Sequence, residues 1–373
     1  MDWLTLRAEF PVTRHWAFFD HAAVAPLPRR TADALRASAD DMEANGVSCL
    51  AGWVRRTDTA RQRIARLIGS DPLDVALLKN TSEGIGVVAE GFPWRNGDNV
   101  VLAAEEYPSN QYPWINLASR GVAVRSVPSR GNRVAIDDLC DAIDARTRVL
   151  AVSFVEFASG FRNDLDALAE ICRLRGVALL VDAIQGLGAL PLDMSQTRID
   201  FLACGGHKWL CGPQGTAFLY VRREWLDRLR PIGVGASSVV GEFDYGTIDY
   251  TLKPHAGRYE SGTLNFGGLA ALGESVGLWL EVGAANVAER VKLLTDHLCD
   301  RAKSAGVPVF SSRDGNDWSG IVSLEVADAE ATAKRCRAAG IVVRERGGRL
   351  RVAPHAYNTT DEIDRLVEVL ACP

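Results

Sequence analysis

The chain has 373 residues, of which 47% are hydrophobic and 24% charged, and its net charge is −5. This composition is that of an ordinary globular protein, and the length predicts one large domain and a smaller one. The basic residues are scattered along the chain rather than clustered, which argues against a nucleic-acid-binding or anionic-membrane surface.

Strands and helices alternate through the first 221 residues. Two predicted helices, 30–44 and 55–68, precede a short strand at 75–78 and a helix that begins near Ile85. Strands are then predicted at 99–103, 122–127, 149–154, 177–181, 201–204 and 216–221, with helices at 109–120, 136–142 and 163–175 between them. This alternation predicts βαβ units and a largely parallel sheet.

The rest of the chain predicts a smaller α+β unit. A segment without clear period, 230–257, precedes helices at 264–282 and 284–304. A strand–helix–strand–strand–helix tail follows at 320–326, 330–339, 341–344, 349–354 and 361–370. We therefore expect an N-terminal segment (1–16), a large domain (17–255) and a small C-terminal domain (256–373).

Small hydroxyl residues follow the first strand of the predicted sheet. Thr81 and Ser82 stand where a helix begins, and the free backbone amides of a first helical turn are suited to hold a phosphate. The alternative is that these residues only cap the helix. A dinucleotide site is disfavoured, because Gly84-x-Gly86 lacks the full glycine fingerprint.

An acid and a lysine follow two neighbouring buried strands. Asp182 ends one apolar run and Lys208 follows the next, so both groups are expected at the carboxyl ends of the strands, where open α/β sheets bind ligands. A desolvated lysine can form an imine with a carbonyl, and a buried carboxylate needs a partner. Pyridoxal phosphate would satisfy both groups, with Asp182 holding the ring nitrogen protonated. The alternative is a buried Asp–Lys salt bridge without a ligand.

The eight cysteines are not expected to form a disulfide framework. They are widely spaced without a C-x-x-C pair, as expected of reduced, mostly buried residues. Cys204, His207 and Cys211 superficially suit zinc, but no comparable ligand pair lies nearby and Lys208 disfavours a cation, so we expect no metal. The first residues contain no basic leader, and no run reaches transmembrane length, so we expect a cytoplasmic protein.

Seven short motifs occur in the chain in the order in which a known family carries them. The chain resembles the class V aminotransferase and cysteine desulfurase superfamily of pyridoxal-phosphate enzymes, in its isopenicillin N epimerase-like and C–S lyase-like branch. The resemblance implies fold type I, the aspartate aminotransferase-like fold, with a large, mostly parallel mixed sheet. The motifs are Phe18–Ala23, Asn80–Gly84, Glu106–Asn110, Val181–Gly186, Gly206–Trp209, Glu260–Thr263 and Arg351–His355.

The resemblance implies a role for each matching residue of the cofactor site. Lys208 would form the internal aldimine and move the substrate's α-proton, and Asp182 and Gln185 would contact the ring nitrogen and the phenolic oxygen. Tyr107 would stack on the cofactor and join Lys208 and Asp182 as a catalytic residue. Phosphate ligands would be Thr81 and Ser82, with His207 alongside.

The resemblance also implies substrate and partner contacts. Arg351 would hold the substrate carboxylate, with Arg344 or Arg346 as substitutes and a structural salt bridge as the alternative. His21 and Ala22 are further candidates for substrate binding. Ser261, Gly262 and Thr263 would reach the phosphate of a partner subunit, which predicts a homodimer.

Two departures from the family pattern bear on the reaction. Gly205 stands where many relatives have Ser or Thr, so that one phosphate hydroxyl is absent and Ser82 or Thr263 must compensate. The stretch 343–349 is short and lacks the cysteine that desulfurases carry there; Cys336 lies upstream on a predicted helix and Cys372 at the tail. Cys204 and Cys211 flank the lysine, and we expect them to be packing residues.

These departures favour an amino-acid lyase over a desulfurase. Elimination of a β-substituent, with cleavage of a carbon–sulfur bond, needs only the quinonoid carbanion and no cysteine. Transamination and epimerisation begin from the same carbanion and remain alternatives. A cofactor-holding protein without catalysis is a further alternative, which the complete residue set disfavours.

Overall fold

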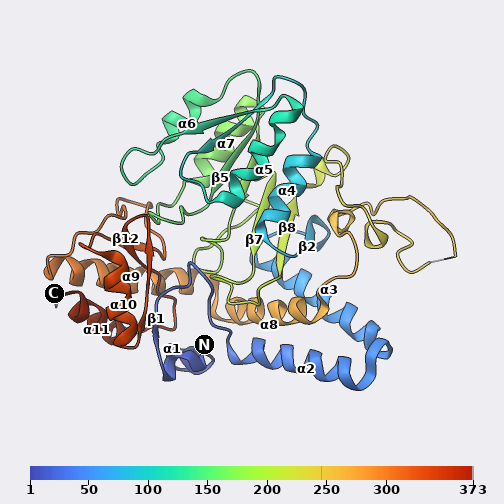
Figure 1. Cartoon of the computed structure of the whole chain (residues 1–373). Helices are drawn as coiled ribbons and strands as arrows, with labels where there is room; N and C mark the ends of the chain where they lie inside the picture. The colour runs from blue at the N-terminus through green and yellow to red at the C-terminus, as the bar shows by residue number, and fades with distance from the viewer. Residues whose placement is uncertain (245, 372–373) are drawn as a thin grey trace.

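A seven-stranded sheet forms the centre of the large domain. The computed structural model describes residues 1–244 and 246–371 (Figure 1). The strand order is β2-β8-β7-β6-β5-β3-β4, and all neighbours are parallel except β8, which runs antiparallel to β2 and β7. The strands are β2 Val75–Leu78, β3 Asn99–Ala103, β4 Ala123–Val127, β5 Thr147–Ser153, β6 Ala178–Asp182, β7 Phe201–Gly205 and β8 Ala217–Val221.

Helices cover both faces of this sheet, which explains why its central strands are continuous apolar runs. Side chains of β3 alternate between two cores: Val101 and Ala103 pack in one, Val100 and Leu102 in the other. The first core contains α3 (Leu50–Leu67), α6 (Ile136–Ala142), α7 (Leu165–Arg175) and α8 (Phe266–Val282), and the second contains α4 (Thr81–Gly91) and α5 (Tyr112–Ile115).

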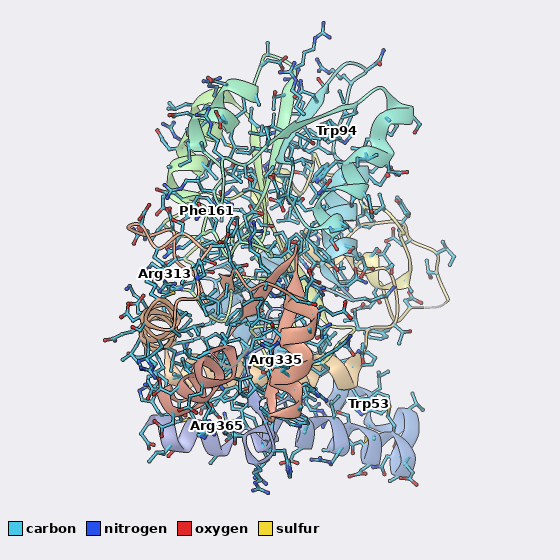
Figure 2. All side chains as sticks on the ribbon, turned by 60° about the vertical axis from the view of Figure 1, so that its left-hand side comes forward. Trp53, Trp94, Phe161, Arg313, Arg335 and Arg365 are labelled. Atoms are coloured by element: carbon cyan, nitrogen blue, oxygen red, sulfur yellow. The ribbon has the colours of Figure 1, made fainter. Side chains whose placement is uncertain are left out.

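The small domain holds a three-stranded sheet in the order β11-β12-β9. Its strands are β9 Val322–Leu324, β11 Arg344–Arg346 and β12 Arg349–Val352, covered by α9 (Ala284–Ser304), α10 (Ala329–Ala338) and α11 (Thr360–Ala371). Figure 2 marks this domain with Arg335 and Arg365 and the large domain with Trp94 and Phe161. None of the helices described here is long and apolar enough to cross a membrane.

The predicted domain boundaries differ from the packing at two places. Strand β1 (Ala17–Phe18) pairs in parallel with β10 (Ile341–Val342), so residue 17 opens an element of the small domain. Helix α1 (Trp3–Ala8) also contacts this domain, because Arg7 forms an ion pair with Glu362 on α11. In contrast, α8 packs against α3 and α2 (Arg29–Asn45) of the large domain, although it lies beyond residue 255.

The predicted strands of the large sheet agree with the structure to within two residues, whereas one predicted helix does not. Residues 109–120 form a single α-helical turn, α5, between short 3₁₀ helices, because Pro108 and Pro113 interrupt the backbone hydrogen bonding. Residues 230–244 and 246–257 extend away from the large sheet, at the right of Figure 1.

Candidate active site

A cavity of about 380 Å³ lies at the carboxyl ends of β6 and β7, closed on the far side by the hairpin β11–β12. Eleven of the expected residues line it: Ala22, Thr81, Ser82, Tyr107, Asp182, Gln185, His207, Lys208, Arg344, Arg346 and Arg351. Larger cavities of about 430, 550 and 910 Å³ lie elsewhere. Among the described residues a lysine lines only the second of these, and this residue, Lys253, forms an ion pair with Glu242 at 2.9 Å. The cavity around Lys208, called the Lys208 cavity below, is therefore the candidate site for imine chemistry.

Asp182 is the last residue of β6 and is almost completely buried. The backbone N–H of Ile184 donates to its Oδ1 atom at 3.0 Å. Burial raises the pKa of Asp182 to about 6, although the Ile184 N–H and the positive charge of Lys208 act in the opposite direction. A cationic or N–H partner would restore the ionised form, which is what a protonated ring nitrogen supplies.

Lys208 lies in the turn that follows β7. The turn is closed by the N–H of Cys211, which donates to the Lys208 carbonyl at 2.8 Å. Burial lowers the pKa of Lys208 to about 8, Asp182 raises it, and Arg351 lowers it further. The ammonium and the Asp182 carboxylate are not within the 4.0 Å of an ion pair. A direct salt bridge thus does not account for the two groups, and Lys208 is available as a nucleophile and base.

Gln185 is held in one orientation by two neighbours. The Trp209 indole N–H donates to Gln185 Oε1 at 3.0 Å, and Gln185 Nε2 donates to the Ala22 carbonyl at 3.0 Å. The amide nitrogen carries a second N–H, which remains to serve a ligand in the cavity. The sequence does not predict Trp209 as a site residue; its signal there is its place in the Gly206–Trp209 motif, next to the lysine.

The first turn of α4 is suited to an anion. Asn80 caps the helix by accepting from the N–H of Glu83 at 2.8 Å, which fixes the direction of the helix start toward the cavity. Thr81 Oγ1 is buried without a hydrogen-bond partner among the described residues, whereas Ser82 donates to Ser109 at 2.7 Å. A phosphate at this helix start would give Thr81 its missing partner and would accept hydrogen bonds from the free backbone N–H groups.

Gly205 and His207 complete the same end of the cavity. A Cβ atom on Gly205 would lie 2.9 Å from Ile184 Cδ1 and 3.1 Å from Thr81 Oγ1. The space that a serine would need is therefore filled, and Thr81 brings the nearest hydroxyl. Burial lowers the pKa of His207 to about 4, so its imidazole is neutral at neutral pH and can contact a phosphate only as a single donor or acceptor.

Tyr107 brings an aromatic face to the cavity. Its ring packs edge-on against Phe157 at 5.2 Å between centroids, and Lys208 Nζ lies 5.3 Å from its centroid. The residue is 43% exposed, and its ring offers a planar ligand in the cavity a surface for stacking. Together with Thr81, Gln185, Asp182 and Lys208, these features fit pyridoxal phosphate: an anion site, a ring-stacking face, an acid and an amine around one cavity.

Three arginines of the hairpin form the opposite side, called the arginine wall below: Arg344, Arg346 and Arg351. Arg351 is buried and donates to the Phe157 carbonyl at 3.0 Å and to Asp20 at 3.2 Å. Arg344 donates to the other oxygen of Asp20 at 2.7 Å. Arg351 therefore does form the structural ion pair, but its Nε–H has no partner among the described residues. This wall is suited to carboxylate binding.

The structure does not place two of the expected residues in the cavity. Both ring nitrogens of His21 are used elsewhere, Nδ1 by the Ala353 carbonyl at 2.8 Å and Nε2 by the Tyr357 hydroxyl at 2.7 Å. His21 therefore does not reach the substrate as expected, because its side chain joins the residues that follow β1 to the small domain. Thr263 lines a separate cavity of about 550 Å³, so its predicted reach to a partner's phosphate remains a prediction.

Glu106 supports the strand next to Asp182 and was recognised only as part of a motif. The N–H and hydroxyl of Ser153 both donate to its carboxylate at 2.5 Å, and Ser153 is the register partner of Asp182. Burial raises the pKa of Glu106 to about 7. Asp20 is the other unanticipated acid, and no local pattern links it to Arg351, which is 331 positions away.

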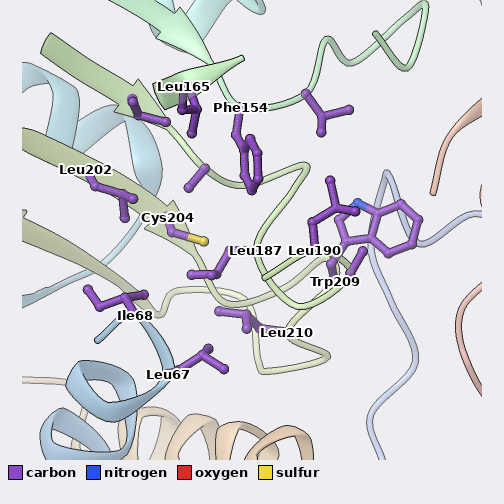
Figure 3. Packing of buried hydrophobic residues seen from close by; sticks show 14 of the residues in the cluster. Leu67, Ile68, Phe154, Leu165, Leu187, Leu190, Leu202, Cys204, Trp209 and Leu210 are labelled. Carbon is purple, nitrogen blue, oxygen red and sulfur yellow. The ribbon is translucent and has the colours of Figure 1, made fainter. Parts of the chain in front are cut away.

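No cysteine among the described residues lines the Lys208 cavity. Cys204 and Cys211 are fully buried in the core, where Cys204 packs among Leu187 and Leu202 (Figure 3). Burial raises the pKa of both thiols. Cys336 is buried in the small domain, and Cys372 lies outside the described residues.

Comparisons with known proteins place this site in a family context. The family model described as Aminotransferase class-V matches residues 17–366. A probable cysteine desulfurase of Methanothermobacter thermautotrophicus is 31% identical, covering 98% of this chain and 96% of its own. An uncharacterized aminotransferase, YcbU, of Bacillus subtilis is 28% identical over 85% of this chain and 84% of its own. The solved structure of the cystine C–S lyase C-DES has a TM-score of 0.91 at 23% identity, covering 97% of this chain and 99% of that one.

Proposed function

The chain belongs to the aminotransferase class-V family and is a pyridoxal-phosphate-dependent enzyme, and on that basis we propose that it is an amino-acid lyase that cleaves carbon–sulfur bonds by β-elimination. The cofactor residues of the Lys208 cavity and the arginine wall support catalysis at the α-carbon of an amino acid. The choice of elimination rests on one observation, the construction of the hairpin β11–β12.

The hairpin turns through only two residues. Gly347 and Gly348 have φ values of 58° and 76°, and β12 follows immediately at Arg349. Both positions require a left-handed conformation that glycine adopts without strain. A desulfurase needs a thiol that can reach the substrate sulfur, and so short a turn provides no loop to carry one. Since no described cysteine lines the cavity, we favour a reaction that leaves sulfur on the departing group.

The residues of the cavity supply the groups that this elimination needs. Pyridoxal phosphate, when bound, withdraws electrons from the α-carbon of an amino acid joined to it. Lys208 takes the α-proton, the β-carbon–sulfur bond breaks with its electron pair on sulfur, and Lys208 returns the proton to the departing thiolate. One water then converts the remaining three-carbon unit to pyruvate and ammonium. Arg351 holds the α-carboxylate, while Asp182 and Gln185 orient the cofactor.

The names of similar proteins point to related sulfur chemistry. One relative is named a probable cysteine desulfurase, and the structural neighbour C-DES is named a cystine C–S lyase. The neighbour supports the fold alone at 23% identity, so the distinction between these reactions depends on the cysteines of this chain.

Product analysis of the purified holoenzyme tests the proposal. We expect S-substituted cysteines to give equal amounts of thiol, pyruvate and ammonium without added keto acid. Formation of alanine and sulfane sulfur from cysteine would instead identify a desulfurase. Exchange that depends on a keto acid would identify a transaminase, and loss of optical activity without products an epimerase.

We also propose that the enzyme is a homodimer. Apolar side chains within residues 230–244 and 246–257 are exposed to solvent, among them Phe243 (59%) and Ile248 (96%). Phe243 and Thr263 line the same separate cavity, so a partner could cover both. Analytical ultracentrifugation should show a dimer down to nanomolar concentration, and a monomer with full cofactor content would refute it.

A further inference from the structure

We propose that Arg346 is a specificity-determining residue that selects substrates whose sulfur-bound group carries a negative charge. This inference deepens the proposed function and rests on it for the identity of the leaving group. It concerns the part of the substrate beyond the α-carbon, which the α-carboxylate site does not recognise. Its basis is an excess of positive charge on the arginine wall.

The direction of Arg346 follows from strand geometry. Side chains two apart on a strand share a face, so Arg344 and Arg346 point the same way from β11. Arg351 is paired with Arg344 in the antiparallel register, which brings its side chain to that face. All three line the Lys208 cavity.

Among the described residues, only one carboxylate, that of Asp20, forms ion pairs with the arginine wall. Asp20 accepts from both Arg344 and Arg351. Arg346 forms no ion pair with any described residue. Among these residues its side chain donates only one hydrogen bond, to the Glu345 carbonyl at 3.4 Å. The Arg346 guanidinium is half-buried and has no acid of its own, so it is available to an anionic ligand in the cavity. The wall therefore has room for two anions rather than one.

The two anions of an ordinary amino-acid complex have other sites. The phosphate belongs to the α4 end of the cavity, where Thr81 lacks a partner. The α-carboxylate belongs to Arg351, the buried arginine with an unpaired Nε–H. Arg346 is left for a third anion, a carboxylate or sulfonate-like group on the substrate side chain, which it can bind through two parallel N–H donors.

Charge-matched ligands separate this recognition from the chemistry. 2-Aminoadipate and its 6-amide have the same shape, differ in one charge and contain no carbon–sulfur bond. Their dissociation constants can be measured by titrating the visible absorption band of the holoenzyme. We expect the anion to bind about tenfold more tightly than the amide. The corresponding substrates are S-carboxymethylcysteine and S-carbamoylmethylcysteine, and we expect the same ratio in kcat/KM.

Variants assign the preference to one side chain. Arg346→Gln should bind the two ligands with equal affinity. Arg349→Gln is the matched control, because Arg349 is the register partner of Arg346 but lies over Phe310 and outside the cavity lining. It should keep the tenfold preference.

Each result decides a separate point. Equal binding of the two ligands by the wild-type enzyme, or an unchanged preference in Arg346→Gln, would overturn the inference. Weaker retention of pyridoxal phosphate by Arg346→Gln, with the preference intact, would assign Arg346 to the phosphate instead and would also overturn it. A preference for 2-aminoadipate without any elimination would support the recognition and refute the lyase proposal.

Discussion

The two sides of the Lys208 cavity are built by different means. On the large-domain side, Asp182 ends a central strand, Thr81 begins a helix, and Gln185 is fixed by Trp209, so each group is held by the sheet or its neighbours. On the other side, the arginine wall is carried by a two-stranded hairpin and tied by the single carboxylate of Asp20. The first arrangement suits chemistry that must be positioned precisely, and the second suits recognition that can change without disturbing it.

Removal of Lys208 should abolish the function of the large-domain side of the cavity. Lys208→Ala loses both the imine-forming amine and the base, so we expect kcat to fall by about 10⁴-fold or more. The visible absorption of the holoenzyme should shift as well. Lys334→Ala, an exposed lysine of α10 paired with Glu330, is the control and should retain full activity. Residual activity above one per cent in Lys208→Ala would contradict this assignment.

Loss of the buried charge should affect the same side less severely. Asp182→Asn keeps the size of the side chain but cannot stabilise a protonated ring nitrogen, so we expect kcat to fall by about 10² to 10³-fold. Because burial already raises the pKa of Asp182 to about 6, the amide should not reduce the unfolding free energy. Parallel kinetics and urea unfolding would check both points, and an Asp182→Asn enzyme with the wild-type kcat would refute the role.

The arginine wall should respond in binding rather than in chemistry. Arg351→Gln removes the proposed carboxylate partner, so we expect KM to rise about 10- to 100-fold while kcat changes less. Steady-state kinetics on the preferred substrate would measure the ratio. Arg349→Gln again serves as the control outside the cavity. A fall in kcat with unchanged KM would show that Arg351 acts on the reaction instead.

The sequence predicted the two sides unequally, for a physical reason. Strands β5 to β8 are apolar runs that can be read locally, and Asp182 and Lys208 follow such runs directly. The contacts that orient these groups join residues far apart in the chain, as Asp20 and Arg351 do, and leave no periodic signal. His21 lies outside the cavity for the same reason, since its partners Ala353 and Tyr357 become neighbours only when Asp20, next to it, forms a parallel bridge with Ala353 after β12.

A smaller effect is expected when only the orientation of Gln185 is changed. Trp209→Phe keeps an aromatic ring but removes the N–H that donates to Gln185 Oε1. We expect a three- to tenfold lower kcat/KM, a shifted pH titration of the cofactor absorption, and about 1–3 kcal/mol less unfolding free energy. Trp279→Phe loses a similar bond to the Leu210 carbonyl, away from the cavity, and should lose stability without a spectral shift. Equal spectra for the two variants would contradict the orienting role.

The smallest expected effect is the contribution of His21 to the pH dependence of the unfolding free energy. His21 is next to Asp20, which anchors the arginine wall. Burial lowers the pKa of His21 to about 4, so between pH 6.5 and 4 the unfolded chain binds a proton that the folded chain does not. Stability from this residue is present above pH 6.5 and is lost as the pH falls, by about 1.4 kcal/mol per unit. Buried acids with raised pKa, such as Asp182, contribute the opposite slope, which cancels in a comparison with a variant. Urea unfolding at pH 7 and pH 5 should therefore show a smaller loss for His21→Asn than for the wild type, whereas Tyr357→Phe, which keeps the imidazole, should retain the wild-type slope. If the unfolding free energy of His21→Asn and of the wild type fell equally between pH 7 and pH 5, His21 would not be held neutral at this contact between the residues after β1 and the small domain.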